Sequence, residues 1–215
     1  MTVILRETHE RIVRRLRRKH FWIQVIELIF FSIFVASSFG FNWFIEIERK
    51  MMNEVYGILK MNVEEMRTRI KLLEVLRSKP LTVGQALAVT DVLIDETKRK
   101  DIKAPLILAV IEQESEFKSI ATSNKGARGV MQIMPETWKL YGPQGDLGKG
   151  MNNIYDPAQN MRVGISYLND LIIEQGNLEK ALSVYYSGQP NFEGSRTYVR
   201  KVLAKAKQFE KDLER

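Results

Sequence analysis

The chain has 215 residues, of which 45% are hydrophobic and 27% charged, and a formal net charge of +7; its length accommodates one domain of ordinary size with additional segments. It contains no cysteine, which excludes disulfide bonds and thiolate metal sites. Its two histidines, His9 and His20, both lie near the N-terminus, which excludes a histidine-based catalytic triad or zinc site in the globular part. We therefore expect no metal and no cofactor.

Residues 1–20 are a basic tail. Seven Arg or Lys residues stand there against two Glu residues, so the tail carries +5 of the net charge of +7. Such a tail can bind nucleic acid or the anionic surface of a membrane. Because an apolar stretch follows directly, we favour the membrane and expect no nucleic acid as a partner.

Residues 21–45 are the most apolar stretch. No charged residue occurs from Leu28 to Phe44, and Trp22 and Trp43 bracket the stretch as aromatic belts do. A helix of about 20 mostly apolar residues crosses a bilayer. We predict a single-pass transmembrane anchor over 21–45 in the inner (cytoplasmic) membrane. The positive-inside rule then places residues 1–20 in the cytoplasm and the rest in the periplasm or another extracytoplasmic space.

Two alternatives to the anchor stay open. A cleaved signal peptide is one, because Ala36, Ser37 and Ser38 offer a small-residue cleavage site; its charged lead of twenty residues is long for that. A buried helix of a soluble domain is the other, although the hydrophobicity surrounds the predicted helix instead of following one face.

Residues 46–79 are predicted to form a helical stalk. Apolar residues recur there every 3.5 residues on average, the period of a left-handed coiled coil. These residues are Met52, Val55, Leu59, Val63, Met66, Ile70 and Leu73. The seam predicts self-association or, as the alternative, packing of one helix against the following domain. Lys79-Pro80 ends the segment.

Residues 80–215 are predicted to form an all-α domain, because no segment shows sustained strand alternation with hairpin signals. Residues with capping chemistry mark where its helices begin. They are Thr82 with Gln85, Asp156 with Pro157, and Asn177. A last amphipathic helix follows Arg196, and the glycine-rich residues 142–150 are expected to form an exposed loop or flap.

Glu114 is the leading catalytic candidate. Residues 104–117 are predicted to be a helix in which Glu114 shares an apolar stripe with Ile111 and Phe117, while Glu112 and Glu116 point to water. Poor hydration favours the protonated carboxyl and raises its pKa. A carboxylic acid that keeps its proton near neutral pH is what general-acid cleavage of a glycosidic bond requires. The alternative is a glutamate at the rim whose carboxylate reaches water.

Sequence blocks in a fixed order surround this residue. Gln-Glu-Ser-x-Phe at 113–117 is followed by Ser-x-x-Gly-Ala-x-Gly-x-Met-Gln-x-Met-Pro at 123–135. Asp-Pro-Ala-Gln-Asn-Met-Arg-Val-Gly at 156–164 and Ala-Leu-Ser-Val-Tyr-Tyr-Ser-Gly at 181–188 come next, and Arg-Thr-Tyr-Val at 196–199 is a weaker last block. Together, over about Leu81 to Ala206, they resemble the soluble-type, family 1 catalytic domain of the lytic transglycosylases, which belong to the lysozyme-like superfamily.

The resemblance implies a lysozyme-like fold and non-hydrolytic cleavage of the β-1,4 bond between N-acetylmuramic acid and N-acetylglucosamine in peptidoglycan glycan strands. In this family one glutamate protonates the leaving oxygen. It then takes a proton from the C6 hydroxyl of the muramic residue, which attacks the anomeric carbon and leaves a 1,6-anhydro end. The resemblance assigns Glu114 as this acid and base. It implies that Ser123, Gln132 and Met134 line the sugar cleft, that Asn160 supports it, and that Tyr185 lies close to the catalytic carboxyl.

The chain departs from the family pattern at two positions. Tyr186 stands where the family usually has asparagine, and Gly194, next to Glu193, stands where it usually has glutamate. The first departure affects local hydrogen bonding and the second a contact in the cleft.

Two other functions stay open. A hydrolytic muramidase on the same fold would need a second carboxylate across the sugar, for which Asp146 in the predicted loop is the candidate. A catalytically silent, wall-binding scaffold is the other. A helper of an envelope-spanning secretion, conjugation or pilus machine, a recycling enzyme and a phage product would share these sequence features.

Overall fold

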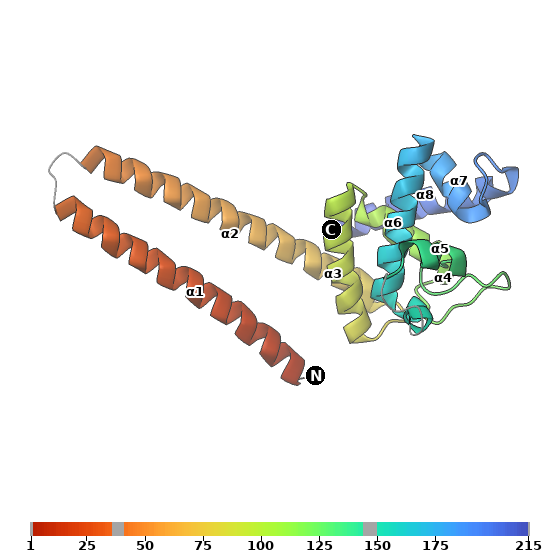
Figure 1. The fold of residues 1–215 in the computed structure, drawn as a ribbon, viewed down its shortest axis with the longest axis horizontal. Coiled ribbons are helices and arrows are strands. Elements are labelled where there is room, and N and C mark those ends of the chain that lie inside the picture. The colour runs from red at the N-terminus through yellow and green to blue at the C-terminus, as the bar shows by residue number, and fades with distance from the viewer. Residues whose placement is uncertain (1, 36–40, 144–149, 215) are drawn as a thin grey trace. The chain divides into compact units, whose positions relative to one another are not determined.

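The computed structural model describes residues 2–35, 41–143 and 150–214, and these residues are almost entirely helical (Figure 1). The chain divides into two compact units, residues 1–63 and residues 64–215. No strand occurs within the described ranges; Arg128 makes isolated antiparallel bridges with Thr122 and Ile133. The predicted all-α class is therefore confirmed for this part of the chain.

The N-terminal unit contains α1, Thr2–Val35, and the first part of α2, Phe41–Arg77. The apolar stretch over 21–45 is thus shared between two helices instead of forming one. The ring of Phe30 in α1 lies 6.5 Å from that of Trp43 and 6.0 Å from that of Phe44 in α2, so two parts of this stretch contact each other.

The predicted transmembrane anchor over 21–45 is not supported. No helix in the described ranges is both long enough and apolar enough to cross a bilayer. The physical reason is that α1 and α2 each contain only part of the apolar stretch and each also carry charged residues, such as Glu27 and Glu46. The candidate cleavage site at Ala36, Ser37 and Ser38 lies outside the described residues.

The second compact unit begins inside the predicted stalk. Leu72 and Leu76 of α2 are buried in its core. Lys71 Nζ donates to the Leu213 carbonyl oxygen at 2.7 Å, and Lys98 Nζ lies 3.0 Å from a carboxylate oxygen of Glu65. For residues 64–77 the structure therefore agrees with the alternative in which the stalk packs against the following domain. The described contacts do not support self-association.

The second unit is built around a short central helix. Its elements follow in the order α3 Val83–Lys100, α4 Ala104–Ser115, α5 Pro135–Tyr141, η1 Gly150–Tyr155, α6 Pro157–Gln175, α7 Leu178–Ser187, η2 Glu193–Ser195 and α8 Arg196–Glu214. Helix α4 packs against α8 and α3, and α6 packs against α3, α5 and α7. All residues of α4 from Leu106 to Ile111 are buried, so this helix is apolar on all sides and not along one stripe.

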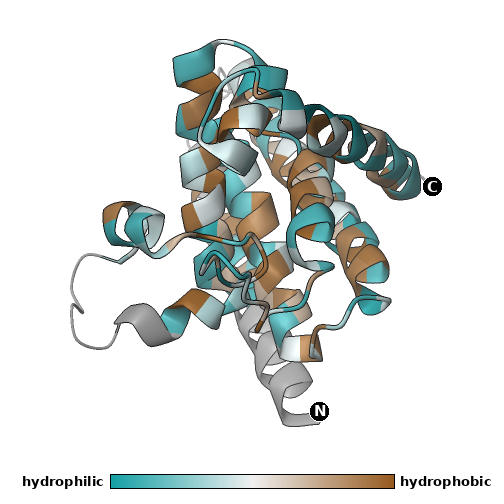
Figure 2. Cartoon of the chain, turned by 90° about the vertical axis from the view of Figure 1, so that its right-hand side faces the viewer, coloured by the Kyte–Doolittle hydropathy of each residue, from teal (hydrophilic) through white to brown (hydrophobic). Residues whose placement is uncertain are grey.

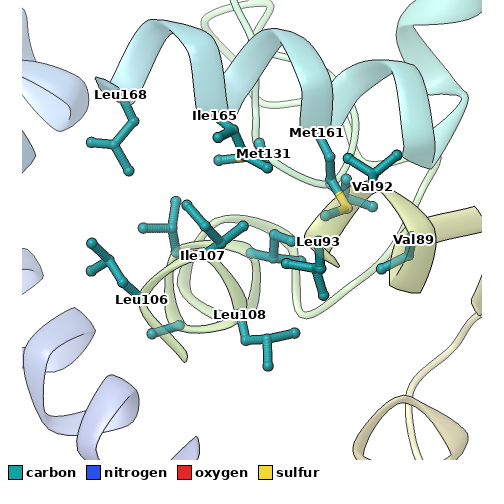
Figure 3. Close-up of a cluster of buried hydrophobic side chains, with 14 of the residues drawn as sticks. Val89, Val92, Leu93, Leu106, Ile107, Leu108, Met131, Met161, Ile165 and Leu168 are labelled. Atoms are coloured by element: carbon teal, nitrogen blue, oxygen red, sulfur yellow. The ribbon is translucent and has the colours of Figure 1, made fainter. Parts of the chain in front are cut away.

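The core lies between α3, α4 and α6. Figure 3 shows Val92 and Leu93 of α3, Ile107 of α4, and Met161 and Ile165 of α6 gathered in it. The surrounding helices are amphipathic, and hydrophilic and hydrophobic residues alternate along α8, which ends at the C label (Figure 2). A buried apolar cluster of this kind holds the end of α4 in a defined place.

The predicted helix boundaries in this unit are mostly confirmed. Thr82 and Gln85 form a reciprocal capping box, in which Gln85 N donates to Thr82 Oγ1 at 3.2 Å and Thr82 N donates to Gln85 Oε1 at 2.9 Å. Asp156 accepts from Gln159 N at 2.8 Å to start α6, and Asn177 accepts from Lys180 N at 3.0 Å to start α7. Each of these caps satisfies a backbone N–H that the helix leaves without a partner.

Gly164 on α6 allows close contact with the loop that carries Met131. A Cβ atom at Gly164 would lie 2.5 Å from Met131 Sδ and 2.9 Å from Met131 Cβ. Met131 is fully buried and lies beside Ile165 in Figure 3, so it has little room to move. This contact joins the segment around residues 123–134 to the helical core.

We predict that Gly164→Ala destabilises the protein by about 1–3 kcal/mol, because it overpacks this contact. Urea unfolding followed by circular dichroism measures the effect. Gly84→Ala is the matched control, because Gly84 lies in a helix with open space around it, and alanine there should leave stability unchanged or raise it slightly. Equal effects of the two changes would contradict the packing argument.

Candidate active site

Glu114 lies in the last turn of α4. The helix ends at Ser115, and Glu116 and Phe117 have positive φ values of 52° and 64°. The prediction of a helix through residue 117 was therefore wrong at its C-terminal end. Phe117 is nevertheless buried. The chain thus turns sharply just after the glutamate, which leaves the Glu114 carboxyl at the end of a buried helix.

Burial governs the protonation of Glu114. Loss of hydration raises the pKa of its carboxyl to about 7, against a hydrogen bond from Tyr198 that favours the charged form. Tyr198 Oη donates to Glu114 Oε1 at 2.6 Å. Burial and the nearby Glu114 charge raise the pKa of Tyr198 well above its ordinary value, so this tyrosine keeps its proton and acts as a donor.

The neighbouring acids lie apart from this arrangement. Glu112 carboxylate oxygens lie 2.7 Å from Lys79 Nζ and 3.9 Å from Lys205 Nζ. Glu116 is exposed and pairs with Lys118 at 2.8 Å. Neither lines the cavity that contains Glu114. Glu116 points to water as predicted, whereas Glu112 is partly buried between the two lysines.

Residues 121–134 form a tight loop opposite Glu114. Ser123 Oγ accepts from Ala127 N at 3.0 Å. Gly129 has a φ of +79°, and a Cβ atom there would lie 2.6 Å from the Ile154 carbonyl oxygen, so only glycine fits. Gly129 of the sequence motif is thus explained by a backbone that approaches its neighbours closely, and Gly126 by its φ of +87° alone.

Asn160 holds this loop from inside the protein. Its side chain is fully buried. Oδ1 accepts from Met131 N at 2.8 Å, and Nδ2 donates to the carbonyl oxygens of Arg128 at 3.0 Å and Ile154 at 2.8 Å. With its amide fully engaged, Asn160 supports the loop and does not itself line the cavity.

Gln132 bends the loop toward the cavity. Its φ is +49°, and its Nε2 donates to the Gly129 carbonyl oxygen at 2.9 Å and to the Ala121 carbonyl oxygen at 3.2 Å. Both bonds use the amide nitrogen, and none of the hydrogen bonds among the described residues uses the amide oxygen of Gln132. Met134 follows at the start of α5 with an exposed side chain.

A cavity of about 640 Å³ joins these elements. Five of the six residues predicted for the site line it: Glu114, Ser123, Gln132, Met134 and Tyr185. The other lining residues are Asn124, Lys125, Ala127, Tyr186, Ser187, Gln189 and Phe192. Polar groups therefore surround the glutamate in an open hollow between the loop, α7 and the segment that follows α7.

Tyr185 connects α7 to the loop across this hollow. Its Oη donates to the Met131 carbonyl oxygen at 2.8 Å, and its ring lies 5.4 Å from that of Tyr167. Burial, followed by the charge of Glu114, raises its pKa well above the ordinary value. Tyr185 is thus a neutral hydroxyl that fixes the distance between α7 and the loop.

Glu114 is the one carboxylate among the residues that line the cavity in the described part of the chain. Asp146, the candidate second carboxylate, and most of the predicted flap lie in residues 144–149, outside the described residues. Within those described, no group of His, Cys, Asp and Glu side chains is arranged to hold a metal ion.

Two tyrosines of this site were missed as site residues. Tyr198 lies in the last and weakest sequence block, and Tyr186 was noted only as a departure from the family pattern. The rings of Tyr186 and Tyr198 stack with centroids 4.7 Å apart. The Arg-x-Tyr-Val block at 196–199 was the available signal for Tyr198, whereas no local pattern indicates that two tyrosines from different helices meet.

Comparisons with known proteins agree with this geometry. The Transglycosylase SLT domain family matches residues 91–208. The chain is 34% identical over 101 residues to a transglycosylase of Enterobacteria phage PRD1, covering 46% of this chain and 35% of that protein. It is 32% identical over 108 residues to the soluble lytic murein transglycosylase of Salmonella typhimurium, covering 48% of this chain and 16% of that protein.

A third relative and a solved structure extend the comparison. The membrane-bound lytic murein transglycosylase C of Mannheimia succiniciproducens is 38% identical over 77 residues, covering 34% of this chain and 21% of that protein. The X-ray structure of an inactive mutant of the lytic transglycosylase Slt from Pseudomonas aeruginosa matches with a TM-score of 0.50 and 28% identity, covering 58% of this chain and 24% of that one.

The chain therefore spans only a minor part of the length of each of these relatives. The family match, in contrast, covers more than half of the chain and includes Glu114, the loop at 121–134, both tyrosines of α7 and Tyr198. On the basis of this match and of the helical unit that carries the site, the chain belongs to the Transglycosylase SLT domain family.

Proposed function

We propose that this protein is a peptidoglycan lytic transglycosylase that cleaves the β-1,4 bond between N-acetylmuramic acid and N-acetylglucosamine and leaves 1,6-anhydromuramic ends. One observation carries the proposal. The Glu114 carboxyl, with a pKa raised to about 7 by burial, lines a cavity of about 640 Å³ in a transglycosylase-family domain and is the one carboxylate among the described lining residues. Relatives named lytic murein transglycosylases support the substrate class.

The first chemical step needs a proton on Glu114. Because burial raises its pKa to about 7, a large fraction of the carboxyl is protonated near neutral pH and can protonate the leaving glycosidic oxygen. Tyr198 donates to Oε1. This hydrogen bond holds the carboxyl in one orientation and stabilises the carboxylate that remains after the proton has left.

The second step needs the same group as a base. The Glu114 carboxylate takes the proton of the muramic C6 hydroxyl, whose oxygen then bonds to the anomeric carbon and closes the anhydro ring. Glu114 regains a proton in place of the one that it gave to the leaving oxygen, so the reaction consumes no water. Ser123, Gln132 and Met134 line the cavity beside Glu114 and are proposed to bind the sugar rings, while Asn160 and Tyr185 hold the loop that presents them.

A hydrolytic muramidase is the second candidate. It would place a water or a second carboxylate across the sugar from Glu114. The described lining residues supply no second carboxylate, and Asp146 lies outside the described residues, so the mass of the released product is what separates the two reactions. Because peptidoglycan lies outside the cytoplasmic membrane, either reaction places the catalytic unit in an extracytoplasmic space.

We predict that Glu114→Gln lowers the turnover of purified peptidoglycan by roughly 10²–10⁴-fold, because an amide neither donates nor accepts the transferred proton. Mass spectrometry of the released sugars measures the effect and also identifies the reaction, since anhydro products are one water lighter than hydrolysis products. Glu116→Gln is the matched control and should keep full activity, because Glu116 is exposed beside the site. An active Glu114→Gln variant would overturn the proposal.

The pH dependence of the reaction should follow the protonation of Glu114. We predict that kcat/KM falls as the pH rises through about 7, because the free enzyme then loses the proton needed in the first step. Initial rates on soluble glycan strands from pH 3 to 9 measure this limb and cover both pKa values. A decline centred near pH 4.5, the value of an ordinary glutamate, would show that the carboxyl is hydrated.

The raised pKa also predicts how stability changes with pH. The folded protein holds the Glu114 proton up to about pH 7, whereas the unfolded chain loses it near 4.5. Between these values the folded state binds more protons at Glu114, so the contribution of Glu114 to stability falls as the pH rises. Glutamine does not titrate. The melting temperature of Glu114→Gln minus that of the wild type should therefore increase from pH 5 to pH 8.

Thermal unfolding at both pH values tests this expectation, with Glu116→Gln as the control that should show no such gain. A Glu114→Gln variant whose melting temperature keeps the same difference from the wild type at pH 5 and pH 8 would contradict the burial of the carboxyl.

A further inference from the structure

We propose that Tyr186 is a positioning residue, which covers Tyr198 and shields its hydrogen bond to Glu114 from the water of the cavity. The proposal deepens the proposed function, since it concerns the same acid and base. It assigns a role to the position at which this chain has a tyrosine in place of the asparagine usual in the resembling family.

The stacking of the two rings is the first observation. Tyr186 of α7 and Tyr198 of α8 have ring centroids 4.7 Å apart and an interplanar angle of 24°. This geometry is close to that of a stacked aromatic pair. Because the two rings come from different helices, the stack holds the orientation of the Tyr198 ring, whose Oη donates to Glu114 Oε1 at 2.6 Å.

The difference in exposure is the second observation. Tyr198 is 5% exposed, whereas Tyr186 is 52% exposed and lines the same cavity as Glu114. The Tyr186 ring therefore lies at the cavity surface with Tyr198 behind it. Replacing it with a small polar side chain would open a path for water to the Tyr198 hydroxyl and to the carboxyl that this hydroxyl contacts.

The adjacent tyrosine of α7 has a different task. Tyr185 donates to the Met131 carbonyl oxygen on the loop, while Tyr186 stacks on α8. Two successive residues thus connect α7 to the two elements on either side of the Glu114 carboxyl. An asparagine at 186 could form hydrogen bonds, but it has no ring to cover Tyr198.

Among the described residues, few titratable groups surround the carboxyl. Those that line the cavity with it are Tyr185 and Tyr186 from α7 and Lys125 from the loop, and Tyr198 of α8 contacts it directly. On its own helix, Glu112 is engaged by Lys79 and Lys205. The hydration of Glu114 is therefore the quantity that a change at Tyr186 should alter most.

The test compares three variants of the full chain. Tyr186→Asn should lower the pKa of Glu114 from about 7 toward 4.5, by about one unit, because water then reaches the carboxyl. Tyr186→Phe keeps the ring and should retain the wild-type value. Tyr198→Phe removes a hydrogen bond to the charged form and should move the pKa in the opposite direction, upward.

Carbon-13 NMR titration of the Glu114 carboxyl measures these values directly, with its signal assigned by its loss in Glu114→Gln. The alkaline limb of the kcat/KM profile should shift by the same amount. At pH 7, a decrease of one pKa unit lowers the protonated fraction, and so kcat/KM, by about fivefold, with KM little changed. Thermal unfolding checks that each variant is folded, which is expected because Tyr186 is half exposed.

An unchanged Glu114 pKa in a folded Tyr186→Asn variant would overturn the proposal, even if that variant were less stable. Equal shifts in Tyr186→Asn and Tyr186→Phe would also overturn it, because they would assign the effect to the hydroxyl and not to the ring. The NMR titration does not depend on turnover. A wild type that releases no anhydro product would therefore refute the proposed function while leaving the shielding measurable.

Discussion

The desolvation of one carboxyl is the constraint on which the rest of this site depends. A glutamate at the end of a helix normally keeps its charge in water, but α4 is buried on all sides from Leu106 to Ile111. Glu114 lies in its last turn, where the charged form of the carboxyl is poorly hydrated. Burial therefore raises the pKa of Glu114 to about 7. The helices around α4 hold this residue in position as much as they stabilise the fold.

The remaining elements of the site limit how much water reaches that carboxyl and where a sugar can bind. Asn160 uses both ends of its amide to hold the loop at 121–134, and Tyr185 connects the same loop to α7. Tyr198 then donates a hydrogen bond to the carboxyl. Rigid support of this kind suits a group that must release a proton and take one back, because both transfers need the same geometry.

The departures from the family pattern bear differently on this arrangement. Tyr186 stacks on Tyr198, and Tyr198 in turn contacts the reacting carboxyl of Glu114. Gly194 lies in η2, where a Cβ atom would come within 2.5 Å of the Phe192 ring. Phe192 lines the cavity. Glycine at 194 therefore leaves room for the Phe192 ring to pack against the backbone, where the family pattern would have a glutamate side chain.

The sequence by itself determined the all-α class, the capping residues of α3, α6 and α7, and Glu114 as the leading candidate, because periodicity, capping chemistry and motif order are local properties. It was wrong about the helix end at Phe117, since a local pattern does not show where α4 stops, and its membrane anchor over 21–45 is not supported by the described helices. The resemblance implied that Asn160 supports the cleft, but only the tertiary structure decided that its buried side chain on α6 bonds to the loop and that Tyr186 meets Tyr198. Those contacts join residues of different elements, Asn160 of α6 with the loop and Tyr186 of α7 with Tyr198 of α8, and the packing of α7 against α8 brings the two rings together.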